Sequence, residues 1–139
     1  MENEMELKFK AISENERFAR MCAAAFAAQL DPTLEQIADI KTAVSEAVTN
    51  AIVHGYCEQV GEVILRGSIR GGEVSYEIID HGSGIEDVEQ ARQPFFTTDY
   101  SGERSGMGFT VMSAFMDEIR VYSEKGKGTT VLLRKKLKL

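Results

Sequence analysis

The sequence predicts an α+β fold, a two-layer sandwich of helices on one face of a mixed, mainly antiparallel sheet. Short segments with alternating apolar residues are typical of strands, and they occur in pairs joined by tight turns. Strands joined in this way must pair antiparallel. Segments with a 3.6-residue apolar period interrupt them, giving the order strand, helix, helix, two strands, loop, helix, two strands. A chain of 139 residues is expected to form one domain, residues 1–139.

The first strand and the first helix are predicted over the first 30 residues. Residues 5–11 alternate between apolar and polar side chains. Ser13 followed by Glu16 predicts a capping box at the start of a helix. The pair Asp31-Pro32 predicts its end. The apolar positions with helical spacing are Phe18, Cys22, Ala25 and Phe26.

The second helix carries clearer signals. Thr33 and Gln36 form a second predicted capping box. Gly55 suits the position just after the last helical residue. The apolar residues between them keep a 3.6-residue period: Ile37, Ile40, Val44, Ala47, Val48, Ala51 and Ile52.

The second half of the chain reads as two hairpins separated by a loop and a helix. Strands are predicted over residues 62–70 and 73–79, with Gly71-Gly72 as the turn. A long loop, 80–108, precedes a helix over 109–118. The last two strands are expected at residues 119–123 and 129–135, around a turn at 125–128.

Composition and charge argue against several classes of function. The net charge of −6 argues against general nucleic-acid binding. The N-terminus lacks a signal-peptide core, and the longest apolar run, residues 21–28, is far too short to span a membrane. Cys22 and Cys57 have no metal or redox spacing. We therefore expect a cytoplasmic protein without a direct nucleic-acid or membrane partner.

Glu46 and Asn50 stand one turn apart inside the second helix. On a helical wheel they lie roughly 150° and 110° from the centre of the apolar seam, beside the core. They form either a solvated face or a ligand stripe. An asparagine offers a neutral oxygen that Mg²⁺ accepts, and a nearby glutamate can take a proton from a nucleophile.

Two glycine-rich clusters follow. In "DHGSGI", Asp80 ends a strand, and Gly82 and Gly84 allow a sharp turn or a close approach to the backbone. A carboxylate there could accept a hydrogen bond from an amino group such as that of adenine. In "RSGMGFT", Gly106 and Gly108 open a helix, whose free N–H groups suit an anion. Arg104, in the same cluster, offers a forked cation for phosphate.

The order of these motifs resembles the ATP-binding domain shared by gyrase-type ATPases, the Hsp90 chaperone, histidine kinases and MutL proteins. The resemblance covers residues 40–131 and implies the Bergerat-type ATP-binding fold. The segments "SEAVTNAIVHGY", "ARQPFFTT", "ERSGMGFTVM" and "FMDE" are similar to the small serine kinases that act as anti-sigma factors in sporulation. The likeness extends over nearly the whole chain.

The resemblance implies an enzyme, a protein-serine kinase with ATP/ADP and Mg²⁺ as cofactors. It implies a homodimer that inhibits a sigma-F-like sigma factor with ATP bound. It also implies phosphorylation of a serine on an anti-anti-sigma protein. Two residues of the first helix, Glu16 and Arg20, match family positions that face these partners. We place both on the exposed side of that helix; on their own, they would read as a surface ion pair.

The resemblance also assigns the nucleotide site residue by residue. Asn50 ligates Mg²⁺, and Glu46 activates the serine hydroxyl. Asp80 reads the adenine amino group with support from Thr130 in "GKGTTV". The remaining assignments are Gly82 and Gly84 beside adenine, Gly106, Met107, Gly108 and Phe109 at the phosphates, residues 92–105 as a lid, and Arg104 at the γ-phosphate.

Other functions stay open at this point. A histidine kinase catalytic domain would need a phosphoacceptor histidine in a dimerisation helix, and His54 and His81 do not fit this. A gyrase-like ATPase would need a following transducer domain, which we do not expect. A non-catalytic, nucleotide-bound sigma-binding module and an anti-sigma kinase for a stress sigma factor remain alternatives.

Overall fold

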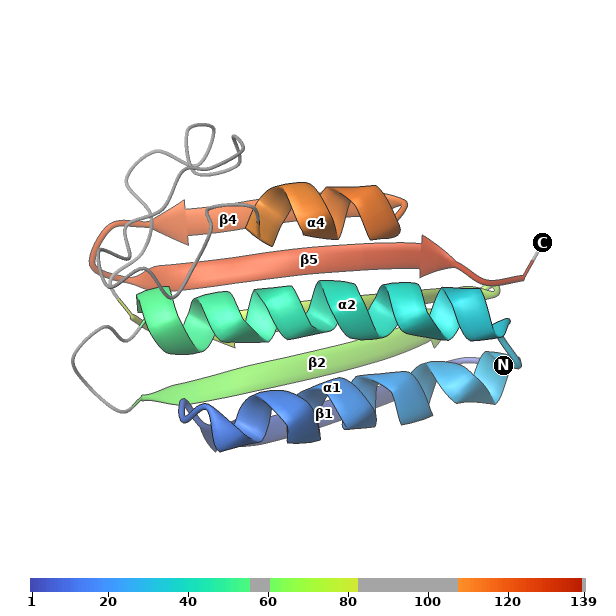
Figure 1. Ribbon diagram of the computed structural model, residues 1–139, viewed down its shortest axis with the longest axis horizontal. Helices are drawn as coiled ribbons and strands as arrows, with labels where there is room; N and C mark the ends of the chain where they lie inside the picture. The colour runs from blue at the N-terminus through green and yellow to red at the C-terminus, as the bar shows by residue number, and fades with distance from the viewer. Residues whose placement is uncertain (56–60, 83–107, 139) are drawn as a thin grey trace.

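The computed structural model describes residues 1–55, 61–82 and 108–138, which form a five-stranded sheet with all described helices on one face (Figure 1). The strand order is β1-β2-β3-β5-β4. All four neighbouring pairs are antiparallel. The two-layer α+β prediction is confirmed, although the described strands include no parallel pair. The strands are β1 (Asn3–Lys10), β2 (Glu62–Arg70), β3 (Glu73–Asp80), β4 (Glu118–Glu124) and β5 (Gly128–Lys136).

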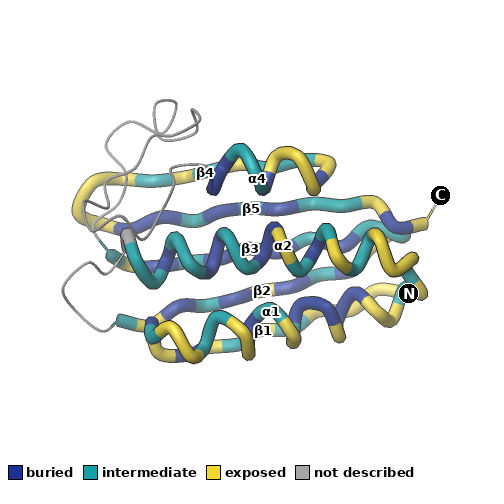
Figure 2. The backbone as a smooth tube through the Cα atoms, in the orientation of Figure 1, coloured by how far each residue is buried: buried dark blue, intermediate teal, exposed yellow. Residues whose placement is uncertain are grey.

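The helical layer covers the sheet from β1 to β4 (Figure 1). It consists of α1 (Glu14–Ala27), the 3₁₀ turn η1 (Ala28–Leu30), α2 (Leu34–Asn50), the π-helical turn η2 (Ala51–Gly55) and α4 (Gly108–Phe115). Buried residues line the contact between the layers, whereas exposed residues face outward (Figure 2). No helix of the described ranges is both long and apolar enough to cross a membrane.

The start of α2 agrees with its prediction. The Gln36 N–H donates to Thr33 Oγ1 at 3.1 Å, and the Thr33 N–H donates to Gln36 Oε1 at 2.9 Å. This reciprocal capping box satisfies two backbone donors that the helix leaves unpaired. The end of α2 differs, because Gly55 belongs to the π-helical turn η2 and does not follow the helix as its cap.

The predicted capping box at the start of α1 is wrong. Ser13 already has helical dihedral angles, φ −59° and ψ −32°, and its side chain makes no capping hydrogen bond. A capping residue needs an extended backbone for its side chain to reach the N–H groups of the first turn. Here the Ser13 hydroxyl donates instead to Glu14 Oε1 at 3.0 Å.

The buried face of α1 is also different from the predicted one. Phe18 and Ala25 are exposed, and Phe18 retains 51% of its accessible surface. The tyrosine at the centre of the sheet sets the rotation of the helix, because Tyr76 Oη donates to Ala23 O at 2.6 Å. Small side chains allow this close approach, and apolar periodicity weighted toward large residues misses it. The residues of α1 that are buried are Ala19, Ala23, Ala24, Phe26 and Ala27.

Two glycines of the sheet have clear steric roles. Gly71 and Gly72 have φ angles of +59° and +77°, as the predicted hairpin turn requires. The turn sets the register that pairs Arg70 with Glu73.

Tyr76 joins the sheet to the helical layer. Burial of the Tyr76 hydroxyl raises its pKa, so the hydroxyl remains a neutral donor to α1. These contacts fix the helical layer over the sheet that carries the candidate site.

Candidate functional site

The described candidate residues gather at one end of the molecule. There α2 and β3 end while β5 and α4 begin (Figure 1). Antiparallel pairing places the last residue of β3, Asp80, opposite Thr129 near the start of β5. The turn η2 contacts both strands, and α2 packs against α4. Residues from four separate elements therefore lie at the same end of the molecule.

Asp80 is a buried carboxylate, with 5% of its surface accessible. Its Oδ1 accepts a hydrogen bond from the Gly82 N–H at 3.0 Å. Burial raises the pKa of Asp80, while hydrogen bonds from the backbone N–H groups of Gly82 and Thr129 partly oppose that rise. A buried acceptor of this kind favours a ligand with an N–H donor, as the adenine amino group provides.

Gly128 allows β5 to begin against the end of β3. Its φ is +115°, and a β-carbon there would lie 2.1 Å from Asp80 O and 2.7 Å from His81 Cα. No side chain fits at that distance, so only glycine is compatible with this approach. Sequence reasoning treated Gly128 only as a turn residue. The available signal was its place directly before the strand that carries the predicted adenine-site threonine.

The assignment of Thr130 to the adenine site is wrong. Successive side chains of a strand point to opposite faces, and Asp80 lies on the helix-covered face together with Thr129. Thr130 therefore lies on the opposite face. Thr129 is buried, and its Oγ1 is 2.8 Å from Ser123 Oγ. The threonine that can support Asp80 is the preceding one in "GTTV".

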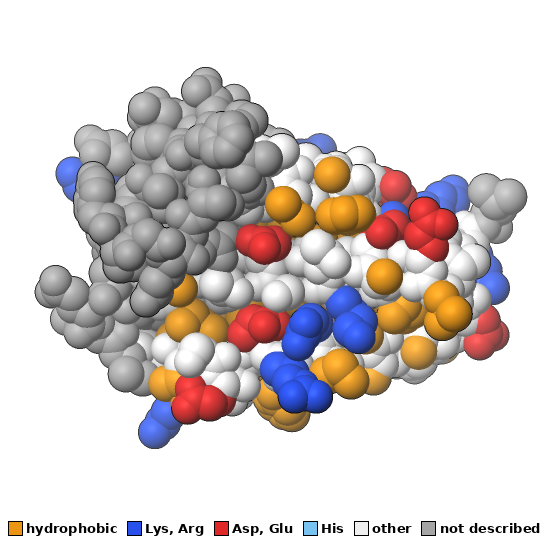
Figure 3. Space-filling view, in the orientation of Figure 1, with side chains coloured by type: hydrophobic (Ala, Val, Ile, Leu, Met, Phe, Trp, Pro, Cys, Tyr) orange, Lys and Arg blue, Asp and Glu red, His pale blue; other side chains and the backbone are white. Residues whose placement is uncertain are grey.

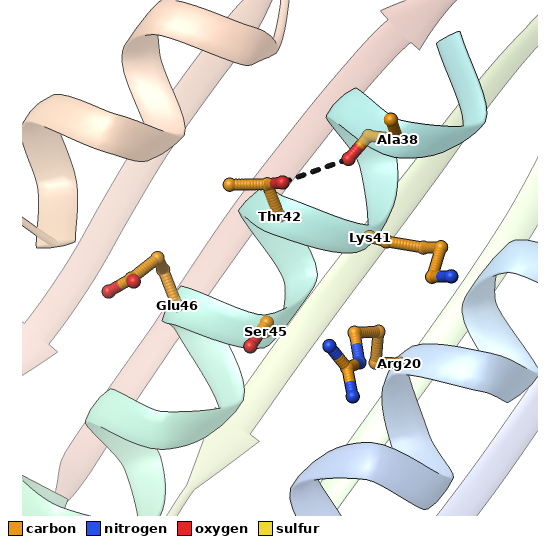
Figure 4. A pocket seen from close by; sticks show the side chains of 6 residues that line it. All are labelled: Arg20, Ala38, Lys41, Thr42, Ser45 and Glu46. Atoms are coloured by element: carbon orange, nitrogen blue, oxygen red, sulfur yellow. Dashed lines mark hydrogen bonds between the residues drawn. The ribbon is translucent and has the colours of Figure 1, made fainter. Parts of the chain in front are cut away.

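Glu46 and Asn50 lie one turn apart near the end of α2, and both are half-buried beside the core. This agrees with the helical-wheel prediction. Glu46 points to the side of α2 on which α4 lies (Figure 4). The π-helical turn η2 follows Asn50 directly. Such turns are frequent at functional sites, because the extra residue re-aims the end of a helix.

The start of α4 completes the described part of the site. Gly108 and Phe109 are its first two residues, and both are buried. Their N–H groups belong to the first turn, which has no partners inside the helix and suits an anion. The other residues predicted for this site, Gly84, Arg104, Gly106, Met107 and the lid 92–105, lie outside the described residues.

The sequence predicted that Glu16 and Arg20 face protein partners from the exposed side of α1. In the structure, both side chains are half-buried. Their side chains retain 24% and 32% of their accessible surface. Arg20 Nε lies 3.4 Å from Glu16 Oε2, yet neither atom makes a hydrogen bond within the described part of the chain. Arg20 borders a shallow cavity of about 310 Å³, here called the α1–α2 hollow. It is lined by Arg20, Ala38, Lys41, Thr42, Ser45 and Glu46 (Figure 4).

The described side chains at this end of the molecule offer few ligands for Mg²⁺ and one buried acceptor for a nucleotide. The described residues contain no group of three or more His, Cys, Asp or Glu side chains placed to hold a metal. Mg²⁺ in phosphoryl-transfer sites uses one or two protein oxygens together with phosphate and water. Asn50 beside the start of α4 fits that sparse set. The buried Asp80 carboxylate fits the purine of the nucleotide.

Comparison with known proteins shows the family of the chain. Residues 9–135 match the model of the histidine kinase-like ATPase domain. The anti-sigma F factor of Thermoanaerobacter sp. (strain X514) is 59% identical over 133 residues, which cover 96% of this chain and 93% of that protein. The chain belongs to the anti-sigma F factor family. The anti-sigma F factor of Clostridium acetobutylicum is 57% identical over 139 residues, covering 100% of this chain and 97% of that protein.

Solved structures share this fold. The RsbU and RsbW domains of Rv1364c from Mycobacterium tuberculosis give a TM-score of 0.71 with 25% identity, covering 97% of this chain and 32% of that longer chain. The catalytic domain of the histidine kinase ThkA gives a TM-score of 0.62 with 15% identity, covering 96% of each chain, which shows the fold alone. The predicted family and its ATPase fold are confirmed, and the nucleotide-binding character of this anti-sigma F factor domain follows from them.

Proposed function

We propose that this anti-sigma F factor holds a sigma-F-like sporulation sigma factor inactive while ATP is bound, and phosphorylates a serine of its anti-anti-sigma protein. Residues 1–139 act as one cytoplasmic domain in both roles. The observation that carries the proposal is that α2 and β3 end where β5 and α4 begin, which brings Glu46, Asn50, Asp80 and the start of α4 to the same end of the sheet. A polar stripe on one helix, a buried acid and a free helix N-terminus form an ATP site with a base beside it.

Each described residue has a task at the nucleotide. Asp80 accepts a hydrogen bond from the adenine amino group, supported by Thr129 on the paired strand. Gly82 and Gly128 carry no side chains, so the backbone can pack closely around Asp80 and leave space for the purine. Asn50 supplies an oxygen to Mg²⁺. The N–H groups of Gly108 and Phe109, with Gly106 and Met107 before them, face the phosphates.

Glu46 holds the proton that leaves the acceptor serine. Its place one turn before the Mg²⁺ ligand brings a carboxylate near the reacting phosphate. Bound Mg²⁺, which Asn50 would hold, would neutralise the charge that develops on the phosphoryl group of ATP. Positioning contributes as well, because α2 carries both the base and the metal ligand on one rigid element.

The homodimer is part of the proposal. Phe18 and Met21 on α1 each retain 51% of their accessible surface, which is high for large apolar side chains. β1, beside them in sequence, forms one edge of the sheet. An exposed apolar stripe beside an open sheet edge suits a second copy of the chain. Arg20 and Glu16, on the same helix, are proposed to face the sigma factor and the anti-anti-sigma protein in turn.

A transfer assay tests the proposal directly. The purified protein, the anti-anti-sigma protein and γ-labelled ATP are mixed with Mg²⁺, and label is followed on the acceptor. Label on one serine, lost when that serine is replaced by alanine, supports the kinase. Nucleotide binding and sigma inhibition without any transfer would favour the alternative of a non-catalytic sigma-binding module. Inhibition of a stress sigma factor and not of sigma F would favour the other alternative.

A further inference from the structure

Three polar side chains form a row across the sheet at the end where the proposed nucleotide site lies. Asp80 on β3 is paired with Thr129 on β5, and Thr129 is paired with Ser123 on β4. Paired residues of neighbouring strands point to the same face, so all three lie on the helix-covered face of the sheet. Ser123 comes from an edge strand and belongs to none of the motifs that predicted the site.

The two hydroxyl groups of this row have a defined hydrogen-bond direction. Ser123 Oγ donates to Gly128 O at 3.1 Å, and it also lies 2.8 Å from Thr129 Oγ1. A serine hydroxyl has only one proton to donate. Because that proton is directed to Gly128 O, the bond between the two hydroxyls forms when Thr129 donates to Ser123 Oγ. The opposite direction would remove this donor from the carbonyl oxygen of Gly128, which is a buried residue.

The direction of this bond determines what Thr129 can offer to a ligand. With its proton directed to Ser123, Thr129 Oγ1 can accept a hydrogen bond from a ligand but has no proton to donate to it. Asp80 beside it is also an acceptor, and the backbone N–H groups of Gly82 and Thr129 donate to its carboxylate. Two neighbouring acceptors favour an amino group, which has two N–H donors, and disfavour a carbonyl oxygen.

Charge alone cannot make this selection between purines. Acidic and basic side chains both lie on the helix side of the molecule (Figure 3). ATP and inosine triphosphate (ITP) carry the same triphosphate, and ITP has a carbonyl oxygen in place of the adenine amino group. The preference for one of them must therefore depend on the hydrogen bonds made at the base.

We propose that Ser123 is a positioning residue that makes the nucleotide site selective for a purine with an amino group. Ser123 accepts the hydrogen bond of the Thr129 hydroxyl and so holds Thr129 as a second acceptor beside Asp80. The inference rests on the proposed nucleotide site. It adds a residue of the edge strand β4 that determines specificity through Thr129.

Titration calorimetry with ATP and with ITP, both in the presence of Mg²⁺, tests this role. In Ser123→Ala the proton of Thr129 can turn toward the base, so the ratio of ATP affinity to ITP affinity should fall about fivefold. Ser123→Thr keeps a hydroxyl and should retain the wild-type ratio. Ser75→Ala makes the same change as Ser123→Ala on β3, on the opposite face of the sheet, and should also retain it. If the alanine variant does not fold, Ser123→Cys keeps the packing with a weaker hydrogen bond and should give the lower ratio.

A double-mutant cycle separates positioning through Thr129 from a general structural effect. Thr129→Val should lower the ratio of ATP affinity to ITP affinity by a similar factor. Adding Ser123→Ala to Thr129→Val should then change the ratio by less than about twofold, because Ser123 acts through the missing hydroxyl. An unchanged ratio in Ser123→Ala, or an equal fall with and without the Thr129 hydroxyl, would overturn the inference.

These affinities are independent of the kinase reaction. If the wild type prefers ATP to ITP but transfers no phosphate, the proposed kinase activity fails, and the measured ratios still decide the role of Ser123. A wild type that binds ATP and ITP equally well would refute the inference alone. A wild type that binds neither nucleotide would refute both the inference and the proposed function.

Discussion

Asp80 and Thr129 lie opposite each other on β3 and β5, and both side chains face the helical layer. Thr129 is the last buried polar residue before the strand turns apolar at Val131. The pair therefore places one ionisable acceptor and one hydroxyl together at the end of the core. This geometry, and not the order of the motif letters, is the reason that we assign Thr129 to the proposed nucleotide site.

Two neighbouring threonines offer a matched test. Thr129→Val should weaken ATP binding about fivefold, because it removes one hydroxyl hydrogen bond from a buried site. Thr130→Val removes the same group on the opposite face of the sheet and should bind ATP like the wild type. Titration with a fluorescent nucleotide measures both affinities. Equal losses in the two variants would contradict the assignment of Thr129.

Asp80→Asn should separate stability from nucleotide binding. Burial raises the folded pKa of this acid above its ordinary value of 3.8, so the folded state favours the protonated form. Its contribution to stability is therefore greatest below pH 3.8 and falls as the pH rises through the folded pKa. Near pH 7 and without nucleotide, Asp80→Asn should melt at a higher temperature than the wild type and lose this part of the pH dependence.

The same Asp80→Asn variant should bind ATP poorly, since an amide cannot replace the carboxylate as an acceptor of full charge. Melting curves from pH 4 to 8, with and without ATP, give both results in one series. The interpretation fails if the nucleotide-free variant is less stable than the wild type at pH 7.

Glu46→Gln should abolish most phosphoryl transfer while sparing ATP binding and sigma inhibition. General bases contribute about 10²–10⁴-fold in rate, and the loss should be of that order. Radiolabel transfer to the acceptor serine measures the rate, and nucleotide titration is its control. Transfer near the wild-type rate would mean that positioning and electrostatics dominate and that Glu46 is not the base.

Asn50→Ala should weaken the Mg²⁺-dependent part of ATP binding. The side chain is half-buried beside the apolar seam, so its loss should change the stability of the fold by less than about 1 kcal/mol. Affinity for ATP is compared with Mg²⁺ and with a chelator, in both proteins. A metal-dependent gain in affinity equal to that of the wild type would exclude Asn50 as a Mg²⁺ ligand.

Arg20→Ala should weaken binding of both protein partners. Truncating an interface arginine at a hot spot costs ~2 kcal/mol or more, so the sigma affinity should fall about 30-fold. Arg17→Ala is the control, because Arg17 is an exposed arginine on the same helix. Affinities are measured with ATP for the sigma factor and with ADP for the anti-anti-sigma protein. Loss of only one partner would mean that the two do not share this residue.

The strands and the second helix follow from the sequence for local reasons. Alternation predicted β2 with its observed ends, and the side-chain pair Thr33 and Gln36 predicted the start of α2. These features depend on contacts between residues near one another in the chain. The family resemblance then placed Glu46, Asn50 and Asp80 at one site.

Long-range contacts explain what the sequence did not reveal. The rotation of α1 depends on Tyr76, 53 positions away from the carbonyl oxygen of Ala23 that accepts its hydrogen bond. The choice between Thr129 and Thr130 depends on the pairing of β5 with β3, which are not consecutive strands. The steric requirement for glycine at position 128 follows from the close approach of its backbone to Asp80, a contact between two strands that the sequence does not show.

The helix α2 has one further consequence for regulation. It carries Lys41 and Ser45 on the side of the first helix and Glu46 and Asn50 in its last two turns, so the proposed nucleotide and the proposed protein partner would both contact this 17-residue helix. Two ligands that bias the same body are thermodynamically linked, and the linkage is reciprocal. If the γ-phosphate raises the affinity for a protein partner by some factor, binding of that partner must raise the preference for ATP over ADP by the same factor. Under the proposed function, release of one ligand would therefore lower the affinity for the other without any further element between the two sites.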